Sequence, residues 1–204
     1  MEKYDVVMLY SGGADSRLML ELARRMGKRV FAVIVDYGQR HWKELEVAVN
    51  TLKKLGVSYQ MIEINGLKIH SKLIDGVVVS QNVNENHVPA RNTWLIGLAL
   101  AYAESLGADE VWYGANFSDR INGFPDCYQE YVVVYNELAK NGLSRPIKVK
   151  APLLGLEKED VVSLLKAFGV NEDEYFSGYG NLENNESAKT KDERDRMVDE
   201  WRWT

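Results

Sequence analysis

Short runs of apolar residues alternate along the chain with longer stretches of helical periodicity. The short runs, several of them rich in β-branched residues, predict strands at 5–10, 30–35, 59–64, 110–113 and 147–150. The longer stretches predict helices at 15–26, 41–55, 93–106, 126–140 and 157–168. Glycines that are expected to end three of these helices stand at positions 56, 107 and 169.

This alternation of strands and helices is typical of an α/β fold. It predicts a doubly wound, Rossmann-like sheet of five parallel strands with helices on both faces. Because right-handed crossovers bring the strand-to-helix loops to one edge of such a sheet, we expect the ligand site there. The loops at that edge are 10–16, 36–42 and 114–126. Two longer segments, roughly 65–90 and 170–188, are expected to serve as lids or substrate-binding insertions.

Composition narrows the possible functions. The 204 residues are 46% hydrophobic and 27% charged, which is ordinary for a globular protein. The formal net charge of −5 gives no basic excess that would indicate binding to nucleic acid or an anionic membrane. A single cysteine fits a reducing compartment. Without a signal-peptide pattern or an apolar run near the ~20 residues of a membrane span, we expect a cytoplasmic protein with neither nucleic-acid nor membrane partners.

The most specific local pattern is the segment 10–16, which reads Tyr-Ser-Gly-Gly-Ala-Asp-Ser between a predicted strand and a predicted helix. Its two glycines would let the backbone approach a ligand, and the helix offers free N–H groups and the positive end of its dipole. Its two serines add hydroxyl donors, so the expected ligand is an oxyanion such as phosphate. The pattern is neither a Walker A loop nor a dinucleotide fingerprint. The alternative is a tight turn capped by Asp15 or Ser16.

A second polar segment, Asp36-Tyr-Gly-Gln-Arg-His41, leaves the second predicted strand at the same edge. Arg40 and His41 are candidate donors to phosphate. Glu44 follows His41 by three residues, so a helix beginning there would place both on one face and let the carboxylate fix the imidazole tautomer. A solvated helix start that carries a charge pair fits the same spacing.

Two further segments carry candidate chemistry. Arg91, in Val88-Pro-Ala-Arg-Asn92, would oppose a helix dipole unless an anion lies nearby, and read alone it is a surface arginine. Residues 113–130 gather carboxylates and aromatic rings after the fourth strand. Such a set could bind a guanine-like edge, because its adjacent N–H donors require carboxylate acceptors and its ring requires a flat partner. The alternative is a helix capped by Asp126.

Taken together, these segments resemble a known family. The loop Ser11–Ser16 resembles the pyrophosphate loop (PP-loop) of the N-type ATP pyrophosphatase superfamily, which has an adenine nucleotide alpha hydrolase-like fold. With 36–44, 88–92 and 125–130 in the same order, the chain resembles the 7-cyano-7-deazaguanine synthase (QueC-like) family from residue 5 to about 168. The resemblance implies a PP-loop domain over 1–168 and a small C-terminal extension over 169–204.

The resemblance also implies an activity that uses ATP and Mg²⁺. The carboxylate of 7-carboxy-7-deazaguanine would be adenylated with release of pyrophosphate, and ammonia would displace AMP to give the amide. A second ATP would then dehydrate the amide to 7-cyano-7-deazaguanine (preQ0), an intermediate of queuosine biosynthesis. Family members also suggest a homodimer.

Candidate site residues follow from the segments and the resemblance together. The catalytic candidates are Lys158, Arg91 and His41. The ATP-binding candidates are Tyr10, Ser11, Gly12, Gly13, Asp15, Ser16, Asp36, Gln39 and Arg40. The substrate-binding candidates are Asn92, Gly114, Asp119, Phe124, Asp126, Tyr128 and Glu130.

The chain departs from the family near its C-terminus. Typical members carry a cluster of cysteines there that holds a structural zinc, whereas residues 175–186 contain none, so we expect no zinc. Because of this departure, the nucleophile that receives the acyl group is left open. It is either ammonia or an amino group of a protein or small molecule. A module that binds ATP or AMP without turnover is the non-enzyme alternative. A sulfur-transferring RNA enzyme of the same superfamily does not fit one cysteine and an acidic charge.

Overall fold

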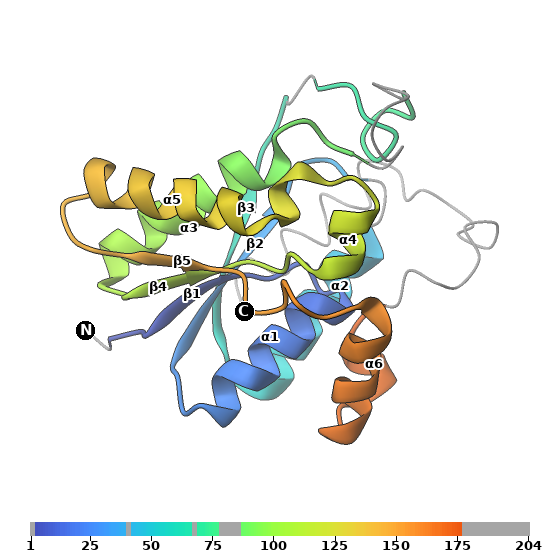
Figure 1. The fold of residues 1–204 in the computed structure, drawn as a ribbon. Coiled ribbons are helices and arrows are strands. Elements are labelled where there is room, and N and C mark those ends of the chain that lie inside the picture. Colours follow the sequence, from blue (N-terminus) through green and yellow to red (C-terminus); the bar gives the residue numbers. More distant parts are fainter. Residues whose placement is uncertain (1–2, 40–41, 67–68, 78–86, 177–204) are drawn as a thin grey trace.

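A five-stranded parallel sheet forms the centre of the protein in a computed structural model that describes residues 3–39, 42–66, 69–77 and 87–176 (Figure 1). The strand order is β3-β2-β1-β4-β5. The strands are β1 (Val6–Leu9), β2 (Val30–Asp36), β3 (Ser58–Glu63), β4 (Glu110–Trp112) and β5 (Lys148–Lys150). The predicted α/β class and the five parallel strands are confirmed. Because the order reverses between β1 and β4, the loops that follow these strands diverge and leave a crevice at the sheet edge.

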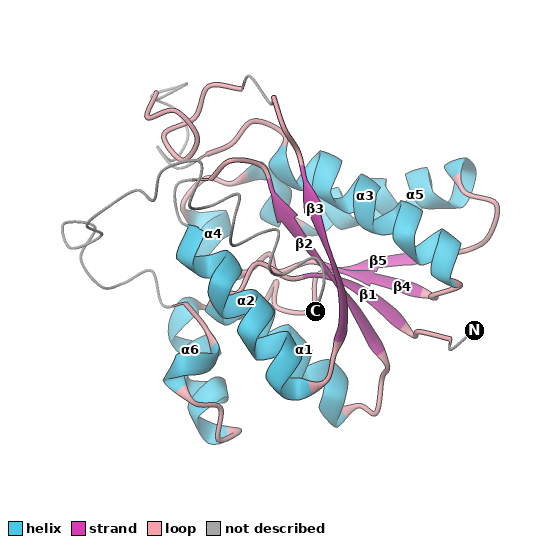
Figure 2. Cartoon of the chain, turned by 180° about the vertical axis from the view of Figure 1, so that it is seen from behind, coloured by secondary structure: helices cyan, strands magenta, loops and turns pink. Residues whose placement is uncertain are grey.

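Helices cover both faces of the sheet (Figures 1 and 2). One face carries α1 (Ala14–Arg25), α2 (Trp42–Leu55) and α6 (Lys158–Ala167). The other face carries α3 (Arg91–Leu106) and α5 (Gln129–Gly142). A short helix, α4 (Phe117–Ile121), follows β4. Within the described ranges, no helix combines the length and the apolar content needed to cross a membrane.

Side-chain alternation along the central strands produces two separate cores. Val6 and Met8 of β1 belong to the core that α1, α2 and α6 cover, whereas Val7 belongs to the core under α3 and α5. All three side chains are fully buried. A strand that is buried on both faces needs apolar residues at every position, which explains why these strands read as continuous apolar runs in the sequence.

The main difference from the predicted elements lies after β4. In place of one helix over 126–140, a 3₁₀ turn at Pro125–Cys127 precedes α5, whose N-cap is Tyr128 without a side-chain hydrogen bond. The alternative in which Asp126 caps this helix is therefore wrong, and its carboxylate instead accepts a hydrogen bond from Asn92 Nδ2 at 2.7 Å. Helix α4 was not predicted because five residues are too few to show a helical period.

The two segments expected to serve as lids are described only in part. Residues 67–68 and 78–86 of the first, and 177–188 of the second, lie outside the described residues. The second segment begins with a 3₁₀ turn at Glu172–Glu174, which contacts α2. Its first residues therefore pack against the domain rather than forming an isolated loop.

Gly12 sets how closely α2 approaches the loop between β1 and α1. Its φ is +90°, and a Cβ atom there would lie 2.2 Å from the Glu44 carbonyl oxygen and 3.0 Å from Ala48 Cβ. Only glycine combines this backbone conformation with such a contact. Gly13 is different, because its φ is −76° and a Cβ atom would meet only Ser11 Oγ at 3.4 Å. The two glycines of the loop thus have different roles.

We therefore expect Gly12→Ala to destabilise the protein by roughly 2 kcal/mol or more, because the new methyl group must displace the backbone of α2. Gly13→Ala is the matched control and should leave the free energy of unfolding within about 1 kcal/mol, since its conformation and surroundings accept a methyl group. Urea unfolding of both variants measures the difference. Equal losses in the two variants would contradict this assignment.

Candidate active site

A cavity of about 440 Å³ opens at the sheet edge beside the carboxyl ends of β1 and β4. Its lining comes from β2 and the loop after it, from the loops after β1 and β4, from the first turns of α2, α3 and α6, and from Tyr175 and Phe176. The volume is within the range of small-molecule sites. The predicted site residues that line it are Tyr10, Ser11, Gly13, Asp15, Ser16, Gln39, Arg91, Asn92, Gly114, Asp119, Phe124, Asp126 and Lys158.

Several other predicted residues do not line this cavity. Gly12 packs against α2, and Asp36 is buried with its Oδ1 accepting a hydrogen bond from the Gly38 N–H at 2.9 Å. Tyr128 is 44% exposed and lies beside Arg120, and Glu130 is exposed. The geometry thus gives Tyr128 and Glu130 no contact with the cavity. Arg40 and His41 lie outside the described residues.

The hydroxyl of Ser16 organises the loop that precedes α1. Its Oγ donates to the Gly13 carbonyl oxygen at 2.9 Å and accepts from the Gly12 N–H at 3.1 Å. Ser11 Oγ accepts from the Gly13 N–H at 3.3 Å. Gly13 is the N-cap of α1 and no side chain caps that end, so neither Asp15 nor Ser16 caps the helix, although Ser16 forms hydrogen bonds within the turn. The first-turn N–H groups of α1 remain available to an anion.

Lys158, the first residue of α6, faces two carboxylates across the cavity. Its ammonium pairs with Asp15 and lies 3.6 Å from Asp119 Oδ2. Asn116 Nδ2 donates to both carboxylates, at 3.2 Å to Asp15 and 2.8 Å to Asp119. Burial raises the pKa of the Asp119 carboxyl above its ordinary value, although Lys158 opposes that shift. Residues from three elements thus meet beside the loop.

Asn116 is a site residue that the sequence reasoning missed. It is fully buried, and its Oδ1 also accepts from the Asp119 N–H at 2.9 Å, which caps α4. The available signal was its place directly after the fourth strand, at the edge where the other loops meet.

Arg91 is the first residue of α3, where its charge opposes the helix dipole. Burial of the guanidinium works against its charge, but a hydrogen bond with Tyr37 and the nearby carboxylates of Asp126 and Glu44 outweigh burial and raise the pKa of Arg91. It is half-buried and lines the cavity, so it is not the surface arginine that its segment suggests in isolation.

Glu44 reaches the same cavity from the first turn of α2. Burial raises the pKa of its carboxyl to about 7, against the smaller effects of Arg91 and Lys158. The expected pairing of Glu44 with His41 cannot be followed, because His41 lies outside the described residues. The position of Glu44 in a cavity beside two cations was not evident from its spacing.

Residues 171–176, called the strap below, contact the loop between β1 and α1. The Phe176 N–H donates to the Gly12 carbonyl oxygen at 2.8 Å, and Tyr175 and Phe176 line the cavity. Glu174 anchors the strap through an ion pair with Arg17 at 2.7 Å. Tyr175 and Phe176 are the first two residues of the segment 175–186 that contains no cysteine, and both belong to the candidate site.

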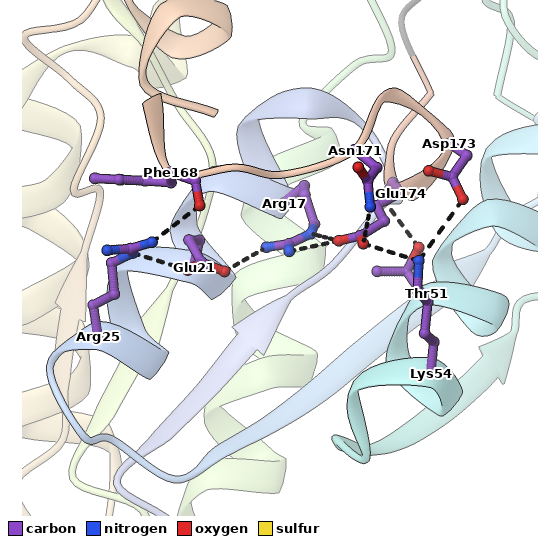
Figure 3. A network of polar contacts seen from close by, with 9 residues as sticks. All are labelled: Arg17, Glu21, Arg25, Thr51, Lys54, Phe168, Asn171, Asp173 and Glu174. Carbon is purple, nitrogen blue, oxygen red and sulfur yellow. Dashed lines mark hydrogen bonds and ion pairs between the residues drawn. The ribbon is translucent and has the colours of Figure 1, made fainter. Parts of the chain in front are cut away.

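Arg17 is a second residue that sequence reasoning missed. It is only 2% exposed and also pairs with Glu21 at 3.1 Å on its own helix (Figure 3). Glu174 further accepts from Lys54 Nζ at 3.0 Å, and its carbonyl oxygen accepts from Thr51 Oγ1 at 3.0 Å. The strap is thereby tied to both α1 and α2. The available signal was an arginine directly before the apolar run Leu18-Met-Leu20.

The described residues contain no group of three or more histidine, cysteine, aspartate or glutamate side chains that could hold a metal ion. The absence of zinc from the whole protein stays a prediction from its single cysteine and three histidines.

Comparison with known proteins connects this site to one family. The family model described as queuosine biosynthesis protein QueC matches residues 5–192. The 7-cyano-7-deazaguanine synthase 1 of Colwellia psychrerythraea is 38% identical over 167 residues, covering 78% of this chain and 76% of that protein. The 7-cyano-7-deazaguanine synthase of Polynucleobacter asymbioticus is 36% identical over 191 residues, covering 85% of this chain and 77% of that protein.

Solved structures of lower identity share the fold. The U34-tRNA thiolase NcsA of Methanococcus maripaludis has a TM-score of 0.57 at 16% identity, covering 98% of this chain and 65% of that one. The NH3-dependent NAD synthetase of Campylobacter jejuni has a TM-score of 0.55 at 21% identity, covering 85% of this chain and 68% of that one. At these identities the likeness concerns the fold alone, and it agrees with the α/β architecture described above.

The strap yields a prediction about stability. Glu174→Ala should lower the free energy of unfolding by about 3 kcal/mol at neutral pH, because it leaves the buried Arg17 guanidinium with only part of its pairing. Asp173→Ala is the control, since Asp173 is 75% exposed and lies 3.8 Å from Lys54, and it should cost under about 1 kcal/mol. Urea unfolding at neutral pH measures both values.

The pH dependence of that difference has a definite sign. Burial would raise the pKa of Glu174, but the hydrogen bonds from Arg17 and Lys54 outweigh burial and hold it below its ordinary value. A carboxyl with a lowered pKa stabilises the fold above its unfolded pKa and loses this effect as the pH falls through the folded value. The gap between wild type and Glu174→Ala should therefore shrink below about pH 4. A gap independent of pH would contradict the ion pair.

Proposed function

This chain belongs to the family of queuosine biosynthesis protein QueC, and we propose that it is an ATP-dependent carbon–nitrogen ligase that acts on 7-carboxy-7-deazaguanine. ATP adenylates the carboxylate with release of pyrophosphate, and ammonia displaces AMP to give the amide. A second ATP takes the amide on to 7-cyano-7-deazaguanine, the product for which the relatives are named. The observation that carries this proposal is that the PP-loop, Lys158 and Arg91 line one and the same cavity.

Adenylation is the chemical requirement, because a carboxylate is a poor electrophile until one of its oxygens becomes part of a good leaving group. The departing pyrophosphate concentrates negative charge beside the PP-loop. In this proposal the N–H groups of the first turn of α1 and the side chains of Lys158 and Arg91, which lie at the cavity, stabilise that charge. In this role Lys158 exchanges its pairing with Asp15 for contact with phosphate oxygens.

Mg²⁺ fits the donors on this side of the cavity. Asp15 and Asp119 present carboxylate oxygens, the ligand type that Mg²⁺ prefers, and one amide group of Asn116 holds both. These two carboxylates would hold the ion against the phosphates of ATP. When bound, Mg²⁺ neutralises phosphate charge during the departure of pyrophosphate.

Recognition of the base is proposed for Asp126, with Phe124 against the ring. Both residues line the cavity, and Asn92 orients the Asp126 carboxylate through the 2.7 Å hydrogen bond. Tyr113 further fixes this turn, because its hydroxyl donates to the Asp126 carbonyl oxygen at 3.1 Å. A carboxylate held in this way can accept from two adjacent N–H donors of a deazaguanine.

A second acceptor is an amino group of a protein or small molecule in place of ammonia. This alternative is retained because the acceptor was left open by the segment 175–186, and Tyr175 and Phe176 of that segment line the cavity. Mass spectrometry of products formed from the protein, ATP, magnesium and 7-carboxy-7-deazaguanine, with and without ammonium, identifies the acceptor. A module that binds ATP without turnover would show no exchange of pyrophosphate into ATP.

The proposed chemistry predicts AMP and pyrophosphate as the nucleotide products, and stoichiometric ADP and phosphate would contradict it.

Lys158→Ala should slow exchange of pyrophosphate into ATP by about a hundredfold or more, because it removes a cation beside the leaving group. Lys166→Ala is the matched control on α6, since its side chain is 63% exposed, and it should leave exchange unchanged. Equal rates in all three proteins would exclude Lys158 from the site.

Base recognition has its own test. Asp126→Asn should weaken binding of 7-carboxy-7-deazaguanine by about 2 kcal/mol or more, because buried N–H donors lose an acceptor. Glu130→Gln should leave this affinity unchanged, since Glu130 is exposed and does not line the cavity. Calorimetric titration of both variants measures the affinities. If Glu130→Gln weakens binding and Asp126→Asn does not, the base is bound elsewhere.

A further inference from the structure

Glu44 is the one cavity-lining carboxylate, among the described residues, that the proposed ligase chemistry leaves without a role. The closeness of Gly12 to the Glu44 carbonyl oxygen fixes the backbone of Glu44 beside the PP-loop. Within the described part of the chain its carboxylate forms no hydrogen bond and no ion pair. The other three carboxylates of the cavity are engaged, Asp15 and Asp119 by Asn116 and Asp126 by Asn92.

An unpaired carboxylate in this position is unfavourable for ATP binding alone. It is half-buried, and its charge would repel the phosphates that Arg91 and Lys158 attract. We therefore expect the Glu44 carboxylate to act in a step that needs a base. Burial raises the pKa of Glu44 to about 7, and a carboxyl that titrates near neutral pH is well suited to accept a proton there.

We propose that Glu44 accepts a proton from the nitrogen nucleophile in the step that displaces AMP. This inference rests on the proposed function. The lone pair of neutral ammonia, or of an amine, attacks the carbonyl carbon of the acyl adenylate. As the carbon–nitrogen bond forms, the carbon–oxygen bond to AMP breaks and its electron pair leaves with AMP. One N–H proton moves to the Glu44 carboxylate, which later returns it to water.

The charged surroundings of Glu44 agree with this role. Arg91 and Lys158 are the cations that act on it, and neither contacts its carboxylate, so the base form is kept available without being neutralised by a fixed ion pair. Both cations are expected to turn toward phosphate when ATP binds. The other titratable groups that line the cavity in the described residues are Tyr10, Asp15, Tyr37, Tyr113, Asp119, Asp126, Cys127 and Tyr175.

The decisive experiment separates adenylation from transfer in the full-length protein. With 7-carboxy-7-deazaguanine present, Glu44→Gln should keep exchange of pyrophosphate into ATP within about twofold of wild type. Formation of the amide from ammonium should fall about a hundredfold, the usual effect of losing a general base. Glu44→Asp should retain part of the transfer rate. Glu46→Gln is the matched control on α2, because Glu46 does not line the cavity, and both rates should be unchanged.

A pH profile gives a signature that a structural role would not produce. At a fixed concentration of unprotonated ammonia, wild-type amide formation should rise as the pH passes about 7 and then level off, because the active form of Glu44 is the carboxylate. Glu44→Gln should lack this inflection.

Three outcomes would overturn the inference. Undiminished amide formation by Glu44→Gln with normal exchange would overturn it alone and leave the proposed function standing. An equal loss of exchange and amide formation would assign Glu44 to ATP binding. Absence of exchange in the wild-type protein would overturn the proposed function, and this inference with it.

Discussion

The candidate site depends on the close packing and hydrogen bonding of one residue, Gly12. Its Cα packs against the backbone of α2, its N–H donates to Ser16 Oγ, and its carbonyl oxygen accepts from the Phe176 N–H. Three segments from distant parts of the chain therefore meet at one residue. Because a larger residue would separate α2 from the loop, this contact also determines where Glu44 enters the cavity.

Two cations, Arg91 and Lys158, line the cavity beside four carboxylates, those of Asp15, Glu44, Asp119 and Asp126. The N-termini of α1, α3 and α6 converge on it, and the first residues of α3 and α6 are Arg91 and Lys158. A cation at that position opposes its own helix dipole, so neither residue serves helix stability. In this structure Asp15 and Asp119 neutralise Lys158. Such local conflicts are expected at sites that receive an anion.

The strap is held to the rest of the domain by a buried ion pair between residues far apart in the chain. Arg17 and Glu174 lie 157 residues apart in sequence and form a buried ion pair that two further hydrogen bonds, from Lys54 and Thr51, support (Figure 3). Anchoring the strap in this way places Tyr175 and Phe176 in the cavity wall. Which side chains line the cavity therefore depends on the contacts that the strap makes with α1 and α2.

The sequence by itself determined the α/β class, the five strands and most of the lining residues, because strand periodicity and the motifs after strands depend on residues near each other in the chain. Only the tertiary structure decided that Asp126 meets Asn92 instead of capping a helix, and that Glu130 faces solvent. It also paired Arg17 with Glu174 and, within the described residues, gave the Glu44 carboxylate no ion pair although Arg91 and Lys158 act on it. These contacts depend on how helices cross the sheet, and no local pattern encodes the distance between side chains that are far apart in sequence.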